Sequence, residues 1–256
     1  MFYYDRELLN LLPAVLRARD FHLYLEGGKR LTDLYLAGGR CILGHKPPRV
    51  VGELKNAAER GLFAPFPHPL EKRFINALGS IFPDRAFRLY ADSFSLFQAL
   101  AQAGFDPEND KNISLWRPFL DMDEASVMIP VLPWPLGPEV LVIDKGLDES
   151  FPSGELIPPV LLAPAARALY DLVSEMKNRA FPRYIKIEKA LANSAWRRAG
   201  IYLSVDPNNI ERNDYLKLFQ DFLEGGFLIP PSPLEPAIFP PSMTPGEESK
   251  LADLLG

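Results

Sequence analysis

Asp144 and Lys145 are the adjacent pair whose types and placement could do chemistry, because they follow the apolar run 140–143. An aspartate at the end of a buried strand can hold a positively charged ring nitrogen, and a lysine can form an imine. Adjacent residues on a strand point to opposite faces, so the Asp144 and Lys145 side chains are poorly placed to contact the same ligand ring. We therefore interpret them as a charged turn after a strand and keep catalysis as the alternative.

His45 is a candidate general base, and Cys41 lies four residues before it. A nucleophilic cysteine needs an activating base, and that base needs a third group to orient it. Cys41, Leu43 and Pro47 around His45 are apolar, and no orienting group is visible nearby in the sequence. We expect a structural histidine, and an unrelated enzyme that uses His45 with Asp92 is a further hypothesis.

Composition and charge exclude several classes of protein. The 256 residues are 47% hydrophobic and 24% charged, which suffices for a sizeable core in one or two domains. A net charge of -5 gives no general attraction to nucleic acid or anionic lipid. We therefore expect neither nucleic acid nor a membrane as a partner.

The cysteine and histidine content bears on metals and on the compartment. One cysteine permits no intrachain disulfide, and the three histidines lack metal-ligand spacing. The first residues lack the basic and apolar regions of a signal peptide. The most apolar tract, 125–143, contains prolines that a membrane helix would not tolerate. We expect a cytoplasmic protein without a metal.

Hydrophobic periodicity predicts the elements that must position these residues. In the first part of the chain, helices are expected at 5–18 (shortened by Pro13), 50–61, 68–78 and 93–103, with Ser93 as a cap of the last one. Residues 21–36 predict a β-hairpin around Gly27–Gly28, and strands are expected at 88–91, 127–132 and 140–143. Residues 104–124 are expected to be irregular.

The last third predicts a small α+β domain. Helices are expected at 165–176, 184–198, 213–223 and 245–255, and strands at 200–205 and 227–229. Two glycines at 225 and 226 end the third helix, and Thr244 is the expected N-cap of the last. A proline-rich connection over 144–164 separates this domain from the preceding part.

The most specific pattern lies near the C-terminus. It begins with a glycine and three apolar residues, continues with a Pro-Ser step and a glutamate, and ends with a threonine before the acidic start of a helix. Its key residues are Gly226, Pro231, Ser232, Glu235, Thr244 and Glu247. The pattern resembles the end of class III pyridoxal-phosphate-dependent aminotransferases, in particular glutamate-1-semialdehyde aminomutase. The match runs without a gap.

Three motifs nearer the N-terminus are similar to the same family. Residues 28–34, with Asp33, resemble the hairpin motif D-G-x-x-Y-x-D, and residues 43–50, with His45, resemble L-G-H-x-x-P-x-V. Arg88 and Ser93 fall where the family has R-F-x-x-S-G-T-E-A. The resemblance covers residues 14–103 and about 160–256. It implies a fold-type-I transferase with its active site at a dimer interface.

The departures from the family determine the expected function. The family's Ser-Gly-Thr turn binds the cofactor's phosphate at a helix N-terminus, which would place Ser93 and Ser95 at the phosphate. Here Phe94 stands where that turn needs a glycine or threonine, so it must either obstruct the turn or point into the core. The family's G-K-x-x-G-G loop, which carries its Schiff-base lysine, has no counterpart. The chain is also much shorter than the family's members.

We therefore expect an α/β protein with an abbreviated fold-type-I architecture and a small C-terminal α+β domain. The expected parts are an N-terminal segment at 1–50, a reduced large domain at 51–160 and the small domain at 161–256. We predict that it has lost transamination, needs no cofactor, and binds a protein partner or a small anionic ligand. Exposed apolar surface left by the missing domain favours a homodimer or a heteromeric partner. The alternative is a minimal pyridoxal-phosphate enzyme that uses Asp144, Lys145 or His45.

Overall fold

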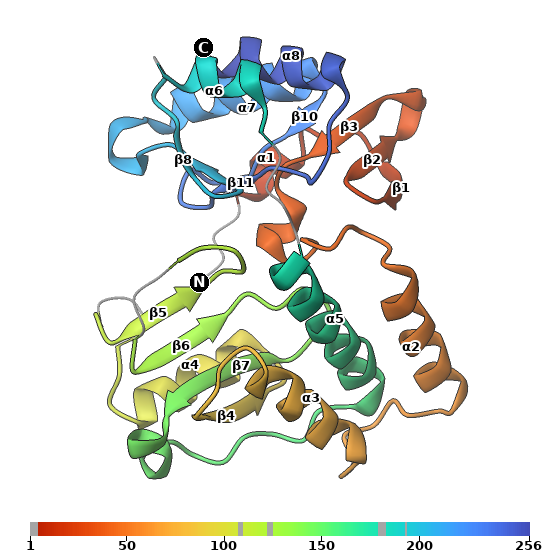
Figure 1. The fold of residues 1–256 in the computed structure, drawn as a ribbon, viewed down its shortest axis with the longest axis vertical. Coiled ribbons are helices and arrows are strands. Elements are labelled where there is room, and N and C mark those ends of the chain that lie inside the picture. The colour runs from red at the N-terminus through yellow and green to blue at the C-terminus, as the bar shows by residue number, and fades with distance from the viewer. Residues whose placement is uncertain (1–4, 107–109, 122–124, 179–182, 193) are drawn as a thin grey trace. The chain divides into compact units, whose positions relative to one another are not determined.

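The computed structural model describes residues 5–106, 110–121, 125–178, 183–192 and 194–256 (Figure 1). Contacts within the chain divide it into two compact units. The first unit combines both ends of the chain, Met1–Lys46 and Arg179–Gly256, and the second is the intervening segment Pro47–Asn178. The predicted mixed α/β composition is confirmed in the described residues.

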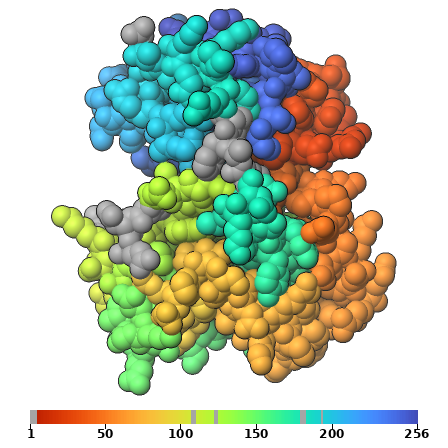
Figure 2. All heavy atoms as spheres, in the orientation of Figure 1, coloured from red at the N-terminus to blue at the C-terminus, as the bar shows by residue number. Residues whose placement is uncertain are grey.

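The first unit is organised around a sheet that joins the two ends of the chain. Its strands are β1 (Val15–Arg19), β2 (His22–Leu25), β3 (Arg30–Asp33) and β10 (Phe227–Leu228), in that order. The first three are antiparallel, and β10 pairs parallel to β3. N-terminal residues in red and orange therefore adjoin C-terminal residues in blue (Figure 2). The predicted hairpin is confirmed, with positive φ at Gly27 and Gly28.

Helices and a second small sheet complete the first unit. They are α1 (Arg6–Leu9), α6 (Ile185–Leu191), β8 (Arg197–Ala199), β9 (Tyr202–Ser204), α7 (Arg212–Gly225), β11 (Ala237–Ile238) and α8 (Pro245–Leu255). Gly226 ends α7 in the left-handed conformation, and Thr244 caps α8, both as predicted. Leu31, Phe219 and Phe227 are fully buried in a core shared by the two chain ends.

The second unit contains a four-stranded sheet in the order β4-β7-β6-β5. Its elements are α2 (Pro48–Glu59), α3 (Pro69–Gly79), β4 (Arg85–Tyr90), α4 (Ser93–Gln102), β5 (Ile113–Trp116), β6 (Val127–Pro130), β7 (Glu139–Asp144) and α5 (Pro159–Asn178). β7 runs antiparallel to β4 and β6, and β5 is parallel to β6. Residues of α4 pack on the sheet in a core with Leu141 and Ile143, and α5 packs along α2 and α3 (Figure 1).

Residues 153–155 cover the free edge of β4. The N–H of Glu155 donates to the carbonyl oxygen of Leu89 at 2.7 Å. A Cβ on Gly154 would lie 2.9 Å from both the backbone N and O of Leu89. This position therefore requires glycine, because the segment passes so close to the strand. Covering the edge also removes a row of unpaired backbone groups.

Several expected elements differ from the structure. The helix at 5–18 is only α1, and β1 follows Pro13; the helix at 184–198 ends at Leu191, and β8 follows. β5 lies inside the stretch 104–124 that was expected to be irregular, because its pairing with β6 is long-range. Asp92, not Ser93, caps α4. Among the described helices, none has the length and apolarity that spanning a membrane requires.

Candidate functional site

The sheet of the second unit separates the predicted site residues into two groups. Cα pairing places Asp144 opposite Arg85 and Glu139 opposite Tyr90. The carboxyl end of β7 therefore lies beside the amino end of β4, whereas α4 begins after the carboxyl end of β4. Asp144 and Lys145 consequently lie at the opposite sheet edge from Ser93 and Ser95.

Asp144 and Lys145 form ion pairs at their edge of the sheet. Asp144 pairs with Arg85, and the Lys145 Nζ lies 3.2 Å from an Asp84 carboxylate oxygen. The Lys145 and Asp84 side chains are both largely exposed. The geometry is that of a charged turn after a buried strand.

Two carboxylates occupy the start of α4, where the resemblance would place a phosphate. An Asp92 carboxylate oxygen accepts the N–H of Ser95 at 2.8 Å. A Glu155 carboxylate oxygen accepts the N–H of Ala91 at 2.7 Å. These are the kinds of backbone donors that bind an anion at a helix N-terminus. Phe94 is 68% exposed, so it does not point into the core.

Pyridoxal phosphate does not fit the residues that the chain places at this edge. A phosphate at the start of α4 would meet the Asp92 and Glu155 carboxylates, which repel it and already use the backbone donors. β4, β5 and β6 are mutually parallel, so their carboxyl ends form the edge where ligands of open sheets bind. None of the five lysines of residues 47–178 follows one of these ends; they are Lys55, Lys72, Lys111, Lys145 and Lys177.

His45 lies in the first unit, where it forms a close pair with Asp33. The His45 Nε2 is 2.8 Å from the Asp33 Oδ2, and the carboxylate is almost completely buried. Burial alone would lower the pKa of His45, but hydrogen bonds to Asp33 and Cys41 outweigh it and raise the pKa to about 10. This shift favours the protonated imidazole over the neutral form at neutral pH.

Asp33 also fixes the turn that follows β3. Its second carboxylate oxygen accepts the N–H groups of Tyr35 and Leu36 at 2.8 and 2.9 Å. Leu36 has a φ of 48°, in the left-handed region that a leucine rarely adopts. Asp33 thus connects β3, a strained turn and His45 within the first unit. The sequence does not reveal this orienting partner, since Asp33 precedes the histidine by twelve residues.

A second charged cluster joins the hairpin to α8 within the first unit. One Glu247 oxygen lies 3.1 Å from the His22 Nε2 and 3.0 Å from the Arg30 Nη2, and accepts the Thr32 hydroxyl at 3.2 Å. The other oxygen accepts the N–H and hydroxyl of Thr244, both at 2.8 Å. Although burial would raise the pKa of Glu247, hydrogen bonds from Thr244, His22 and Thr32 lower it to about 2. From the sequence, Glu247 is recognisable only as part of the acidic start of the last helix.

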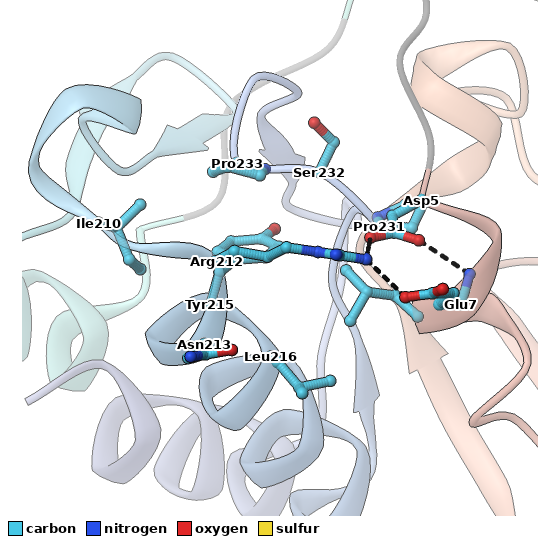
Figure 3. A pocket seen from close by; sticks show the side chains of 11 residues that line it. Asp5, Glu7, Ile210, Arg212, Asn213, Tyr215, Leu216, Pro231, Ser232 and Pro233 are labelled. Atoms are coloured by element: carbon cyan, nitrogen blue, oxygen red, sulfur yellow. Dashed lines mark hydrogen bonds and ion pairs between the residues drawn. The ribbon is translucent and has the colours of Figure 1, made fainter.

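A cavity of about 640 Å³ lies in the first unit, between α1, the start of α7 and residues 231–233 (Figure 3). Its polar side chains include Asp5, Glu7 and Arg212. The Arg212 Nη2 lies 3.0 Å from the Asp5 Oδ2 and 2.5 Å from the Glu7 Oε2. The sequence alone does not reveal this site, because its walls come from opposite ends of the chain.

The backbone and apolar side chains give the cavity its shape. The N–H of Asp5 donates to the carbonyl oxygen of Pro231 at 2.8 Å, which ties α1 to the 231–233 loop. The Tyr215 hydroxyl donates to the carbonyl oxygen of Pro230 at 2.7 Å. Leu8 and Leu216 contribute apolar wall. The site therefore combines fixed backbone, apolar surface and a cluster of charges.

Metal chemistry has no obvious centre in the part of the chain that the structure describes. No three His, Cys, Asp or Glu side chains gather there in an arrangement that could hold a metal ion.

Comparison with known sequences identifies mainly uncharacterised relatives. No protein-family model matches the chain. It is 30% identical to an uncharacterised protein of Treponema pallidum over 175 residues, which span 66% of this chain and 56% of that protein. It is 28% identical to an uncharacterised protein of Borreliella burgdorferi over 253 residues, or 95% and 90% of the two chains. A shorter match of 64 residues, 38% identical, is to glutamate-1-semialdehyde 2,1-aminomutase of Clostridium acetobutylicum, covering 25% of this chain and 15% of that enzyme.

Solved structures establish the fold. An omega-transaminase from Sphaerobacter thermophilus superimposes with a TM-score of 0.69 at 10% identity, covering 94% of this chain and 89% of that one. An ornithine delta-aminotransferase from Plasmodium falciparum gives a TM-score of 0.68 at 11% identity, with 94% and 91% coverage. The chain therefore has the fold of the pyridoxal-phosphate-dependent aminotransferases, in agreement with the fold class expected from its motifs.

Proposed function

We propose that this chain has an aminotransferase fold without pyridoxal-phosphate-dependent transamination, and that it acts by binding. The start of α4 is the observation that carries this proposal. Asp92 and Glu155 use backbone donors that a cofactor phosphate would need, and they place two negative charges there. Lys145, the lysine considered for catalysis, lies at the opposite edge of the sheet in an ion pair with Asp84.

An absorption titration with pyridoxal phosphate tests the proposal. We expect no band at about 410–430 nm, which is typical of an internal aldimine. After borohydride treatment we expect adducts scattered over exposed lysines and none that is stoichiometric. One lysine fixed at stoichiometric cofactor would refute the proposal and favour the minimal enzyme.

A double variant tests the physical reason. Asp92→Asn and Glu155→Gln keep hydrogen-bond acceptors at the start of α4 but remove both charges. We expect inorganic phosphate to shift the amide signals of residues 91–95 in the variant and not in the original protein. Equal phosphate shifts in both proteins would show that the carboxylates do not exclude the anion.

The proposed partner is protein, either a second copy or a different chain. Phe63 and Phe66, in the loop between α2 and α3, are each 62% exposed. Two exposed phenylalanines in one loop place apolar surface in water, and such surface is often covered by a binding partner. Light scattering at micromolar concentration should show a mass above that of one chain, and Phe63→Ser with Phe66→Ser should reduce it. A stable monomer would refute self-association and leave a heteromeric partner to be sought by co-purification. A cytoplasmic location remains part of this proposal.

A further inference from the structure

The cavity between α1 and α7 carries a more specific inference about what this chain binds. We propose that it takes a small organic cation, an ammonium or guanidinium group on an apolar stem. This inference rests on the proposal that the chain acts by binding, and it names the ligand's chemical class. All the residues that line the cavity belong to the first unit.

The charge of the lining favours a cation over an anion. Two carboxylates, Asp5 and Glu7, face one guanidinium, that of Arg212. A ligand carboxylate would have to displace a carboxylate of the chain from Arg212. An added cation is instead attracted by the excess negative charge.

Arg212 shows what the carboxylates accept. Its Nη2 is within 3.0 Å of both Asp5 and Glu7, so a guanidinium already lies where the ligand cation would bind (Figure 3). The Arg212 side chain is 72% exposed and that of Glu7 is 80% exposed. Ion pairs this exposed contribute little net stability, so an incoming cation can displace Arg212 at small cost.

Asp5 is the fixed part of the site. Its side chain is 29% exposed, and its Oδ1 accepts the N–H of Glu7 at 2.8 Å as the N-cap of α1. Its Oδ2 is the oxygen that faces Arg212. One oxygen therefore holds the carboxylate in place while the other is directed at the cation. A carboxylate fixed in advance loses little conformational entropy when it binds.

The apolar walls of the cavity would contact the apolar stem of the ligand. Leu8 and Tyr215 are buried, Leu216 is partly exposed, and Pro231 and Pro233 close the opposite side. The Tyr215 hydroxyl is bonded to Pro230, so its ring remains as an apolar surface. A volume of about 640 Å³ is in the range of sites for small organic ligands.

The test uses three probes that differ only in their polar end. Phenethylamine is the cation, 2-phenylethanol is neutral and 3-phenylpropionate is the anion. Each is titrated into the full-length protein without pyridoxal phosphate, and amide chemical shifts are followed by NMR. We expect phenethylamine to shift residues 5–8, 210–216 and 231–233 at millimolar concentrations, and to bind more tightly than the other two. No shift in these segments, or tighter binding of 3-phenylpropionate, overturns the proposal.

Two variants that remove charges of opposite sign from the cavity should change phenethylamine binding in opposite directions. Asp5→Asn keeps a good N-cap and should weaken phenethylamine binding at least about fivefold, since it removes a charge-assisted hydrogen bond. Arg212→Gln removes the internal competitor and should strengthen binding several-fold. Arg6→Gln removes the same charge from an exposed α1 residue outside the cavity and is the matched control. If Arg212→Gln weakens binding, the guanidinium contacts the ligand and the proposal fails.

A final comparison asks whether the bound cation belongs to a protein side chain or to a free small molecule. The blocked dipeptide N-acetyl-Leu-Arg-amide carries the cation on a peptide, and phenethylamine carries it on a free small molecule. Tighter binding of the dipeptide assigns the cavity to a basic side chain of a protein, and the reverse order assigns it to a free amine. The pyridoxal-phosphate titration is a separate measurement, so an aldimine there would refute the proposed function without deciding the cavity's ligand.

Discussion

Replacing Asp33 by asparagine would isolate the ion pair between Asp33 and His45. Asparagine retains the Oδ1 that accepts the N–H groups of Tyr35 and Leu36, so the turn after β3 keeps its hydrogen bonds. The variant removes the charge from the atom that faces the His45 Nε2 at 2.8 Å. The measured effect therefore reports the interaction of the carboxylate with the imidazolium.

The magnitude follows from the pKa of His45. Burial would lower this pKa, but Asp33 and Cys41 together outweigh burial and raise the pKa from 6.5 to about 10, with the hydrogen bond to Asp33 as the largest raising contribution. At about 1.36 kcal/mol per pKa unit, the charged form is stabilised by roughly 3–5 kcal/mol. Breaking a buried ion pair by removing one partner has a similar cost. We expect Asp33→Asn to lower the free energy of unfolding by about 3–5 kcal/mol at pH 6.

The sign of the pH dependence is a second readout. Because the folded protein holds the His45 proton more tightly, the stabilisation is complete below the unfolded pKa of 6.5 and is lost as pH rises toward about 10. Urea unfolding of the original protein should therefore show stability falling over this window, whereas Asp33→Asn should remove most of that slope. Asp20→Asn, at an exposed carboxylate of the same unit, is the control and should keep it. An unchanged slope in Asp33→Asn, or a loss below about 1 kcal/mol, would refute the reasoning.

Three further substitutions probe other features. Glu247→Gln should lower the free energy of unfolding by about 2–3 kcal/mol near neutral pH. Because the pKa of Glu247 is lowered from 4.5 to about 2, the carboxylate's stabilisation is present above pH 4.5 and is lost as pH falls toward about 2. Circular dichroism during acid titration should therefore show a flatter loss of stability in the variant. Gly154→Ala should lower the free energy of unfolding, measured in urea, by about 1–3 kcal/mol, because its Cβ would collide with the Leu89 backbone. Gly146→Ala is the control and should have a much smaller effect, because there is open space around Gly146. Thr244→Ala should lower the free energy of unfolding by about 1 kcal/mol, because it removes the N-cap of α8. Thermal unfolding measures this effect, and a decrease in Tm no larger than that of the control Ser249→Ala would contradict it.

Local chemistry explains the elements that could be predicted from the sequence. The glycine pair at 27 and 28 allows the positive φ of a tight hairpin, and Thr244 followed by Glu247 forms a capping box. Both signals lie within a few residues of the feature that they determine. Gly226 ends α7 for the same local reason.

Tertiary pairing explains the elements that were missed. β5 has four residues and is defined by its parallel partner β6, so its own sequence carries little signal. The helix expected at 184–198 stops early because 197–199 pair with β9 instead. The cavity is less predictable still, since Arg212 and Glu7 are 205 residues apart in the sequence. No periodicity connects residues at that separation.

The sheet that contains both ends of the chain has a consequence for biosynthesis. The hairpin leaves the ribosome long before its partners β10 and α8. Arg30 and Glu247, which join the hairpin to α8, are 217 residues apart. At 5–20 residues per second, this interval is roughly 10–40 s. The segment 47–178 has all its own contacts well before then and can fold during translation. Until β10 is synthesised, the nascent hairpin lacks its partner along β3, which makes this edge a natural site for chaperone protection.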